Sequence, residues 1–504
     1  MTTAAHRTWV TIAVMAATVM QAIDTTIANV ALPHMQGALS ASFDQIAWVL
    51  TSYIVASAIC IPLTGFLAAR FGRKRVFTTA VIGFTLASML CGAAQSLSEI
   101  VAARLLQGVF GAALVPLSQA VLLDTWPRER HASAMAWWGV GVMVGPVLGP
   151  TLGGFLTEYY SWRWVFFINV PIGALAWIGV TVFLSETPID RERRFDLFGF
   201  GLLAVAIGAL QLCLDRGQTL DWFASPEIVA EALVAALAFY MFIAHMLTHR
   251  EPFFEPALFR DRNFIAASTF ALVIGMVLLS TIALLPPYLQ TLLGYPVFDV
   301  GVLLASRGIG SMLGMLTVGR VGDHVHPLTL IFPGMLLTCG SLYWMSLFDL
   351  DTTPALIVIT GFIQGTGIGL IFVPLSTSAF STLAPQLRNE GTALYSLTRN
   401  IGSSVGISIV TSLLARNTQA NHASLVQYAS PLNPATQMPG YPEEWSLHST
   451  ATIAALEHEV SRQSQMLAYV QDFRMMLWLC LLAMPLLLLF SRGRRRADTA
   501  AIVD

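Results

Sequence analysis

The sequence predicts an all-α polytopic membrane protein with about fourteen transmembrane helices in a 6+2+6 arrangement. Hydrophobic residues occupy 55% of the 504 positions and charged residues only 11%, about half the charge expected of a soluble protein. Apolar segments long enough to cross a bilayer as helices recur along the whole chain. An internal repeat relates the fourth of these segments to the twelfth. No basic tract is long enough to indicate a nucleic-acid partner.

The first apolar segment opens near Trp9 and resembles a signal peptide at first sight. It is too long for a cleaved segment and it carries Asp24, so we expect a retained membrane helix. The predicted spans begin near Trp9, Ile46, Val76, Glu99, Ala132, Trp164, Leu197, Ile228, Asn263, Phe298, Leu328, Pro354, Gly391 and Asp472.

Connections between the spans are short, except for a predicted loop over residues 416–471. This loop contains Pro431, Pro434, Pro439 and Pro442, followed by a predicted amphipathic helix from Ile453 to Tyr469. The five cysteines lie in apolar runs without metal-binding spacing, which predicts free thiols and no metal site.

The distribution of basic residues predicts the orientation in the membrane. Most of the 27 lysines and arginines fall on one side of the predicted spans. Examples are the run from Arg70 to Arg75, the arginines at 191, 193 and 194, and those at 492, 494, 495 and 496. Because basic loops stay in the cytoplasm, we expect both termini there and the long loop outside.

The repeat divides the chain into two related halves. Gln107-Gly108 recurs 257 positions later as Gln364-Gly365, and Pro116-Leu117-Ser118 recurs 258 positions later. This spacing predicts a six-helix half over 1–190, two linker helices over 191–250 and a second six-helix half over 251–504. Parallel repeats of this kind are typical of secondary transporters.

A polar stripe in the first predicted span is the strongest candidate for a functional site. Gln21, Thr25 and Asn29 repeat at every fourth position, with Asp24 at the edge of the stripe. A carboxylate inside a membrane helix is costly unless it faces protein or a wet cavity. Locking two helices together is the alternative role, but a wholly polar stripe favours function.

Arg104 is predicted to lie at the same depth as Asp24, about 8 Å from the outer interface. We therefore expect the two to meet and to carry proton coupling; the alternative is that Arg104 only binds backbone carbonyls. Arg307 and Arg399 lie near mid-span without an acid at matching depth. They indicate a substrate anion or a wet cavity, with carbonyl hydrogen bonds as an equal alternative. The predicted substrate cavity is lined by Gln21, Thr25, Asn29, Gln107, Arg307, Gln364 and Arg399.

Two glycine-rich motifs indicate moving parts. The stretch from Gly141 to Gly154 places small residues on one helix face, which allows close packing, and its prolines bend the helix. The basic turn from Gly65 to Lys74 is either a topology signal or a gate. The predicted gating residues are Gly65, Arg70, Gly72, Arg73, Gly141, Gly145, Pro146, Gly149, Gly153, Gly154 and Asp323.

Two sequence patterns that are typical of enzymes are not supported by the residues around them. Gly402-Ser403-Ser404-Val405-Gly406 matches a nucleophile pattern but lies in an apolar helical segment without a preceding strand. Lys74, the only lysine, is followed by Arg75, so no phosphate-binding loop exists. The sequence therefore predicts a protein that is not an enzyme.

At this point several motifs carry a family likeness. They are Ile23 to Pro33, Arg104-Leu105-Leu106-Gln107-Gly108, Gly141 to Gly154, Phe166 to Gly173 and Leu214-Asp215-Arg216-Gly217. The chain resembles the major facilitator superfamily, within it the fourteen-span drug/proton antiporters of the EmrB/QacA type, and most closely EmrB-like inner-membrane multidrug efflux pumps. One departure is Ala69, where the family carries an acid; the second-half copy keeps Asp323.

The resemblance implies export of hydrophobic or amphipathic toxic compounds by alternating access, driven by the proton motive force without a bound cofactor. It implies a bacterial inner membrane, with a periplasmic adaptor (an EmrA-like membrane fusion protein) and an outer-membrane channel as partners. The long outer loop then serves as a docking element or a lid. Two alternatives stay open: a dedicated exporter of one metabolite, and a membrane sensor with a transporter fold but no flux.

Overall fold

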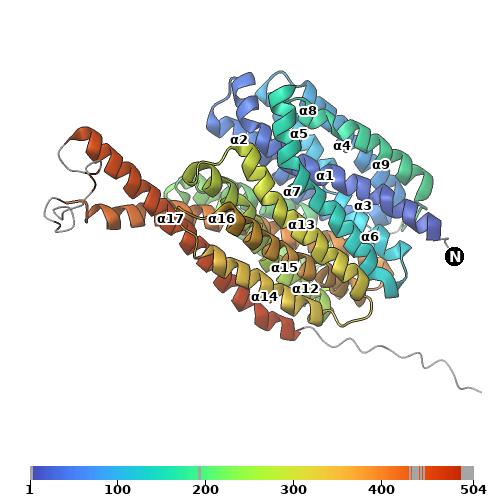
Figure 1. Cartoon of the computed structure of the whole chain (residues 1–504). Helices are drawn as coiled ribbons and strands as arrows, with labels where there is room; N and C mark the ends of the chain where they lie inside the picture. Colours follow the sequence, from blue (N-terminus) through green and yellow to red (C-terminus); the bar gives the residue numbers. More distant parts are fainter. Residues whose placement is uncertain are drawn as a thin grey trace, which may run out of the picture.

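The computed structural model describes residues 4–190, 194–430 and 449–489, with positions 433, 442 and 445 (Figure 1). Within these residues the regular secondary structure is entirely helical. The predictions for Pro431, Pro434 and Pro439, for the arginines at 191 and 193, and for those at 492–496 lie outside the described residues.

The helices follow the predicted apolar segments. The first group is α1 (Ala4–Ala38), α2 (Phe43–Cys60), α3 (Leu63–Phe71), α4 (Arg73–Ala93), α5 (Leu97–Gly111), α6 (Leu114–Thr125), α7 (His131–Tyr159), α8 (Trp164–Phe167) and α9 (Asn169–Phe183). Two linker helices follow, α10 (Leu197–Arg216) and α11 (Pro226–Thr248). The last group is α12 (Arg262–Pro287), the short π-helix η4 (Tyr288–Leu292), α13 (Val297–Val321), α14 (Leu328–Met345), α15 (Pro354–Ser381), α16 (Arg388–Val426) and α17 (Thr450–Ala483).

The number of spans differs from the predicted fourteen. Among the described residues, 12 helices are long and apolar enough to cross a membrane, or 13 when α2 and α3, bent by 55° to each other, count as one span. The predicted thirteenth span lies in α16, a helix of 39 residues that carries several charged and amide side chains. The multi-pass helical fold is therefore confirmed, and the count of fourteen is not.

The predicted long loop over 416–471 is largely helical. Helix α16 continues to Val426, and α17 runs without a break from Thr450 to Ala483, so the predicted amphipathic helix and the last span form one helix. Ser449 caps its start, and no proline or glycine interrupts it. His422 contacts Glu457 at 2.7 Å, and the two helices project together from the bundle (Figure 1).

Helix packing joins distant parts of the chain. Helix α1 packs against α7, α9 and α6, while α12 packs against α16 and α15. Helices α7 and α13 pack against each other and so connect the first group of helices to the last group. The linker helices α10 and α11 pack side by side. The division at 190 and 250 stays a prediction.

The glycines of α7 let it approach α1 closely. A Cβ atom at Gly145 would collide with the Ala22 backbone, and one at Gly149 would collide with the Thr26 side chain. Thr26 Oγ1 also donates a hydrogen bond to the Gly145 carbonyl at 3.0 Å. Gly154, by contrast, has no atom within 4 Å of such a Cβ. The glycine face therefore fixes the position of α1 on both sides of Asp24.

We predict that Gly145→Ala lowers the free energy of unfolding by about 1–3 kcal/mol, because the added methyl group overpacks a backbone contact. Gly154→Ala is the matched control on the same helix. It should stabilise the protein by about 0.5–1 kcal/mol, because alanine favours the helix and meets no neighbour. Thermal unfolding of the purified variants measures both. Equal melting temperatures would contradict the packing analysis.

Candidate functional site: a buried carboxylate–arginine network

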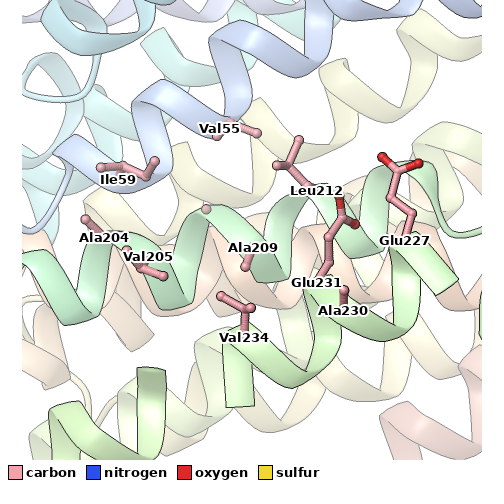
Figure 2. A pocket seen from close by; sticks show the side chains of 11 residues that line it. Val55, Ile59, Ala204, Val205, Ala209, Leu212, Glu227, Ala230, Glu231 and Val234 are labelled. Carbon is pink, nitrogen blue, oxygen red and sulfur yellow. The ribbon is translucent and has the colours of Figure 1, made fainter. Parts of the chain in front are cut away.

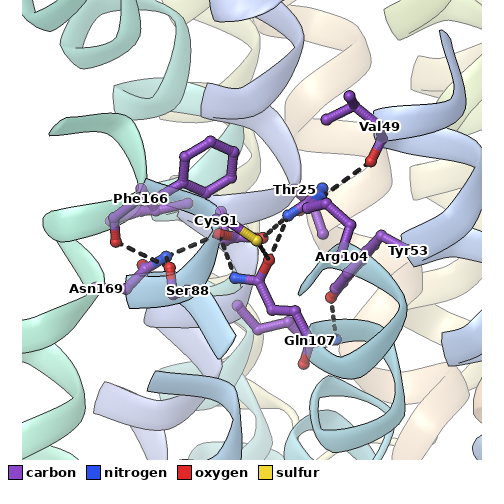
Figure 3. A network of polar contacts seen from close by, with 12 residues as sticks. Thr25, Val49, Tyr53, Ser88, Cys91, Arg104, Gln107, Phe166 and Asn169 are labelled. Atoms are coloured by element: carbon purple, nitrogen blue, oxygen red, sulfur yellow. Dashed lines mark hydrogen bonds and ion pairs between the residues drawn. The ribbon is translucent and has the colours of Figure 1, made fainter. Parts of the chain in front are cut away.

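The Asp24 carboxylate accepts hydrogen bonds from three side chains in a buried polar network. Figure 3 shows this network, with Arg104, Gln107 and Asn169 labelled. Arg104 Nη1 donates to Asp24 Oδ2 at 2.7 Å. Gln107 Nε2 donates to Asp24 Oδ1 at 2.8 Å, and Asn169 Nδ2 donates to the same oxygen at 2.7 Å. Asp24, Gln107 and Asn169 are 0% exposed. The predicted contact between Asp24 and Arg104 is therefore present.

Arg104 is held from several directions. Its Nε donates to the Val49 carbonyl at 3.0 Å, and its Nη1 also donates to Gln107 Oε1 at 2.7 Å. The guanidinium lies 4.5 Å from the centroid of the Tyr53 ring. The carbonyl contact considered as an alternative thus exists beside the ion pair. Because one cation balances one carboxylate, the buried network is electrically neutral with Asp24 ionised.

A second set of contacts positions these groups. Asn169 Nδ2 also donates to Ser88 Oγ at 2.9 Å, and Ser88 Oγ donates to the Phe166 carbonyl at 2.9 Å. Sequence reasoning missed Ser88, Tyr53 and the role of Asn169. The only signal was that Asn169 belongs to the motif from Phe166 to Gly173. Helices α5 and α9 therefore contact the carboxylate carried by α1, and α4 holds Asn169 in place through Ser88.

The other members of the α1 stripe do not join this network directly. Gln21 donates to the Tyr53 hydroxyl at 3.3 Å. Thr25 donates to the Ala22 carbonyl at 3.0 Å, and Asn29, which is exposed, donates to the Thr25 carbonyl at 3.3 Å. Only Gln21 is linked to the network, through the ring on which Arg104 stacks.

The predicted cavity residues of the last helices lie in separate places. Arg307 is buried and donates to the Leu278 carbonyl at 2.9 Å. A hydrogen bond to a backbone carbonyl was the alternative to a substrate-binding role for this arginine. Arg399 is half-buried, with its guanidinium 5.5 Å from the Phe372 ring centroid. Gln364 is fully buried. Within the described part of the chain, no carboxylate is near either arginine.

A cluster of charges joins the two halves near the start of α1, and we call it the latch: Arg73, Asp124, Arg388 and Asn389. Arg73 Nη1 donates to Asp124 Oδ2 at 2.6 Å, and Arg388 Nη1 forms an ion pair with Asp124 Oδ1. Arg73 Nε donates to Asn389 Oδ1 at 3.0 Å. Sequence reasoning missed Asp124 and Arg388. The latch obtains its carboxylate from α6, although position 69 is alanine.

A second contact between the halves lies beside the latch. Asp323 Oδ1 accepts a hydrogen bond from the backbone N–H of Ala132, at the start of α7, at 3.0 Å. Burial raises the pKa of Asp323, while the N–H donors oppose this shift. The carboxylate caps the positive end of the helix.

Two glycines of the basic turn, Gly65 and Gly72, determine how the backbone packs and turns between α3 and α4. A Cβ atom at Gly65 would lie 2.9 Å from the Glu390 Cα, so glycine lets α3 approach α16. Gly72 has φ +92°, a conformation that favours glycine between α3 and α4. Arg70 lies half-buried at the end of α3. The turn therefore packs against the second half of the chain rather than standing free.

A separate pocket of about 610 Å³ lies between α2, α10 and α11. Its walls are mostly aliphatic, with Glu227 and Glu231 at one end (Figure 2). Arg216 pairs with Glu227 there. None of the residues predicted to line the substrate cavity lies in this pocket. The substrate-binding role of those residues therefore stays a prediction.

Comparison with known proteins decides the family. The family model for the Major Facilitator Superfamily matches residues 14–407. The chain belongs to the major facilitator superfamily. A Neisseria gonorrhoeae protein named "Fatty acid resistance protein FarB" is 38% identical over 424 residues, 84% of each chain. The Escherichia coli K12 "Multidrug export protein EmrB" is 37% identical over 433 residues, 85% of this chain and 84% of the relative.

Solved structures of this superfamily share the fold. The proton:xylose symporter XylE aligns with a TM-score of 0.61 at 11% identity, covering 95% of both chains. The human organic anion transporter MFSD10 aligns with a TM-score of 0.57 at 13% identity, covering 94% of this chain and 99% of the other. The predicted family, fold class and non-enzymatic nature of this major facilitator protein are confirmed.

We predict that Asp24→Asn destabilises the transporter by about 3–5 kcal/mol, because it leaves Arg104 buried without a carboxylate. Arg104→Gln should cost a similar amount for the opposite reason. Unfolding of the two single variants and the double variant measures their coupling, and the double variant should be more stable than the sum of the single effects indicates. Additive effects would show that the ion pair is not energetically important.

We also predict that Asp124→Asn opens the latch, because it removes the carboxylate shared by Arg73 and Arg388. A loss of about 1–2 kcal/mol raises the open population about 5–30-fold. Hydrogen exchange at the starts of α4 and α16 should accelerate accordingly. Glu129→Gln, at an exposed acid nearby, is the control. Equal exchange in both variants would contradict a latch.

Proposed function

We propose that this transporter is a proton-driven antiporter that exports hydrophobic and amphipathic toxic compounds across the bacterial inner membrane. The observation that carries the proposal is the ion pair between Asp24 and Arg104, buried among amide donors in the first helices. An intramembrane carboxylate is expensive to keep, so it indicates a functional role. The name of the relative "Multidrug export protein EmrB" supports the proposed substrate class.

Proton binding at Asp24 would act by removing one charge of the pair. A proton arriving from outside binds a carboxylate oxygen, and Arg104 then loses its ionic partner. The guanidinium keeps the Val49 carbonyl and the Tyr53 ring, so it can move away from α1 towards α2. Release of the proton to the inside restores the pair. Protonation of Asp24 thereby changes the free-energy balance between two arrangements of α1.

Alternating access would connect this change to the latch. Under the proposed orientation, with both termini in the cytoplasm, the latch closes the cytoplasmic end. Helix α1 packs against α7 through Gly145 and Gly149, and α7 begins at the Asp323 contact. A shift of α1 therefore reaches the latch through α7. The substrate cavity would lie between the two halves, near Gln107 and Gln364.

Lipophilic weak acids are the proposed preferred substrates. Arg307 and Arg399 supply positive charge in the last helices without a nearby carboxylate in the described residues. The name of the relative "Fatty acid resistance protein FarB" supports an anionic substrate, because an ionised fatty acid carries a negative charge. A narrow substrate profile would instead favour a dedicated exporter of one metabolite, and binding without flux would favour a sensor.

The proposed partners are a periplasmic adaptor and an outer-membrane channel. Under the proposed orientation the projecting ends of α16 and α17 lie in the periplasm, where an adaptor can reach them. Their antiparallel contact, including the pair of His422 and Glu457, gives a more rigid docking element than a loop would. A lid over the outer mouth of the cavity is the alternative use.

The test uses purified protein in liposomes with an imposed pH gradient and no ATP. A medium-chain fatty acid and a lipophilic cation are compared as substrates, for the native chain and for Asp24→Asn. We expect gradient-driven flux of the fatty acid that falls at least tenfold in the variant, with weaker flux of the cation. Asp351→Asn, at an exposed acid, should transport normally.

Other outcomes separate the alternatives. Unchanged coupling in Asp24→Asn would move the proton site elsewhere. A preference for the cation would contradict the proposed substrate sign. Absence of flux in the native protein, despite measurable fatty-acid binding, would support the sensor.

A further inference from the structure

The second half of the chain lacks the charges of the Asp24 network. Thr281 lies 257 positions after Asp24, and Gln364 lies 257 positions after Gln107. They make the corresponding contact, with Gln364 Nε2 donating to Thr281 Oγ1 at 3.5 Å. At the position 257 residues after Arg104 the chain has a glycine. The amide of the network is thus kept in the second half, while its acid and its arginine are replaced.

The second half nevertheless buries an acid at a neighbouring place. Thr281 Oγ1 approaches Met476 Sδ of α17 at 3.7 Å, and Asp472 lies one helical turn before Met476. Asp472 is 0% exposed. Neither of its carboxylate oxygens has a hydrogen-bond partner. A fully buried carboxyl group without any partner is unusual in a native structure and requires an explanation.

Aromatic side chains surround this part of α17. Tyr469, one turn before Asp472, has its ring centroid 5.4 Å from that of Tyr288. The Tyr288 ring in turn lies 5.9 Å from Phe348, and Phe348 lies 6.1 Å from Phe473. The Tyr288 hydroxyl donates to the carbonyl of Asp349 at 3.0 Å, in an exposed turn. The cluster therefore extends from the buried acid to the surface.

The surroundings of Asp472 favour its neutral form. Within the residues that the structure describes, the titratable side chain that interacts with Asp472 is Tyr469 on α17. Tyr469 interacts in turn with Tyr288 on η4, and Tyr288 with Asp349. Among the described residues, no cation balances Asp472. Burying an unpaired carboxylate costs several kcal/mol, whereas a protonated carboxyl avoids most of this cost.

We propose that Asp472 is a second proton-binding site of this transporter, occupied in the conformation described here. The inference rests on the proposed proton coupling, but it concerns a different site in the other half of the chain. In this conformation Asp24 is paired with Arg104, whereas neither carboxylate oxygen of Asp472 has a hydrogen-bond partner. A proton from outside binds a carboxylate oxygen of Asp472 next to the Tyr469–Tyr288 cluster, and the same proton is released inside later in the cycle.

Infrared spectroscopy of the purified protein tests whether Asp472 holds a proton. The C=O stretch of a protonated carboxyl should be present in the native spectrum and should disappear in Asp472→Asn. The band should persist in Asp24→Asn and in the exposed control Asp351→Asn. Asparagine has nearly the same shape and no charge, so the melting temperature of Asp472→Asn should change little. An unchanged carboxyl band in Asp472→Asn would overturn the proposal.

Proton stoichiometry in liposomes tests whether the site takes part in transport. The logarithm of the fatty-acid gradient at steady state is plotted against the imposed pH difference, and the slope gives the number of protons per substrate. We expect the slope of Asp472→Asn to be lower by one proton than that of the native chain, and the slope of Asp351→Asn to be unchanged. Asp472→Glu, which restores a titratable group, should recover the native slope.

The outcomes distinguish this inference from the proposed function. A native chain without gradient-driven flux would overturn the antiport function and the transport role of Asp472 together. If the native chain couples flux to the pH gradient and Asp472→Asn gives the same slope, only the transport role of Asp472 would be overturned. A lowered melting temperature would show that Asp472→Asn is misfolded. The infrared experiment would then use Asp472→Glu, in which the carboxyl band should shift in frequency.

Discussion

A carboxylate can remain ionised inside a membrane protein only when a cation and hydrogen-bond donors replace water around it. In this major facilitator protein the ion pair of Asp24 and Arg104 meets that requirement, with Gln107 and Asn169 as further donors. Three helices, α1, α5 and α9, must be placed correctly to provide these groups. The pair is therefore a structural constraint on the first half of the chain.

The contacts of α1 show how such a change can spread. Helix α1 carries Asp24 and packs directly on the glycine face of α7, whose first turn is capped by Asp323 from the other half. The latch around Asp124 lies beside this contact. Because close-packed helices move as rigid bodies rather than deform, α1 and α7 form a contiguous route between the buried charge and the contacts that join the halves.

Corresponding positions of the two halves carry different side chains. Gln107 and Gln364 keep their contacts with corresponding helices, but Asp24 is matched by Thr281. In the second half Asp472, on the last helix, is fully buried and has no hydrogen-bond partner. One carboxylate is thus neutralised by an arginine, whereas the other avoids charge by protonation. The two buried acids therefore differ in their surroundings.

The sequence by itself determined the fold class, the multi-pass topology and the contact between Asp24 and Arg104, because hydrophobic length and intramembrane charge are local properties that a bilayer constrains strongly. Depth along two helices was enough to predict that this pair meets. The sequence did not determine the roles of Asn169, Asp124 or Arg388, because their partners lie far away in the chain. It also misjudged the segment before Asp472, which belongs to the same unbroken helix as the last span and packs against α16. The partnerless state of Asp472 could only be decided by tertiary structure, because burial and the absence of donors are properties of everything that surrounds a side chain.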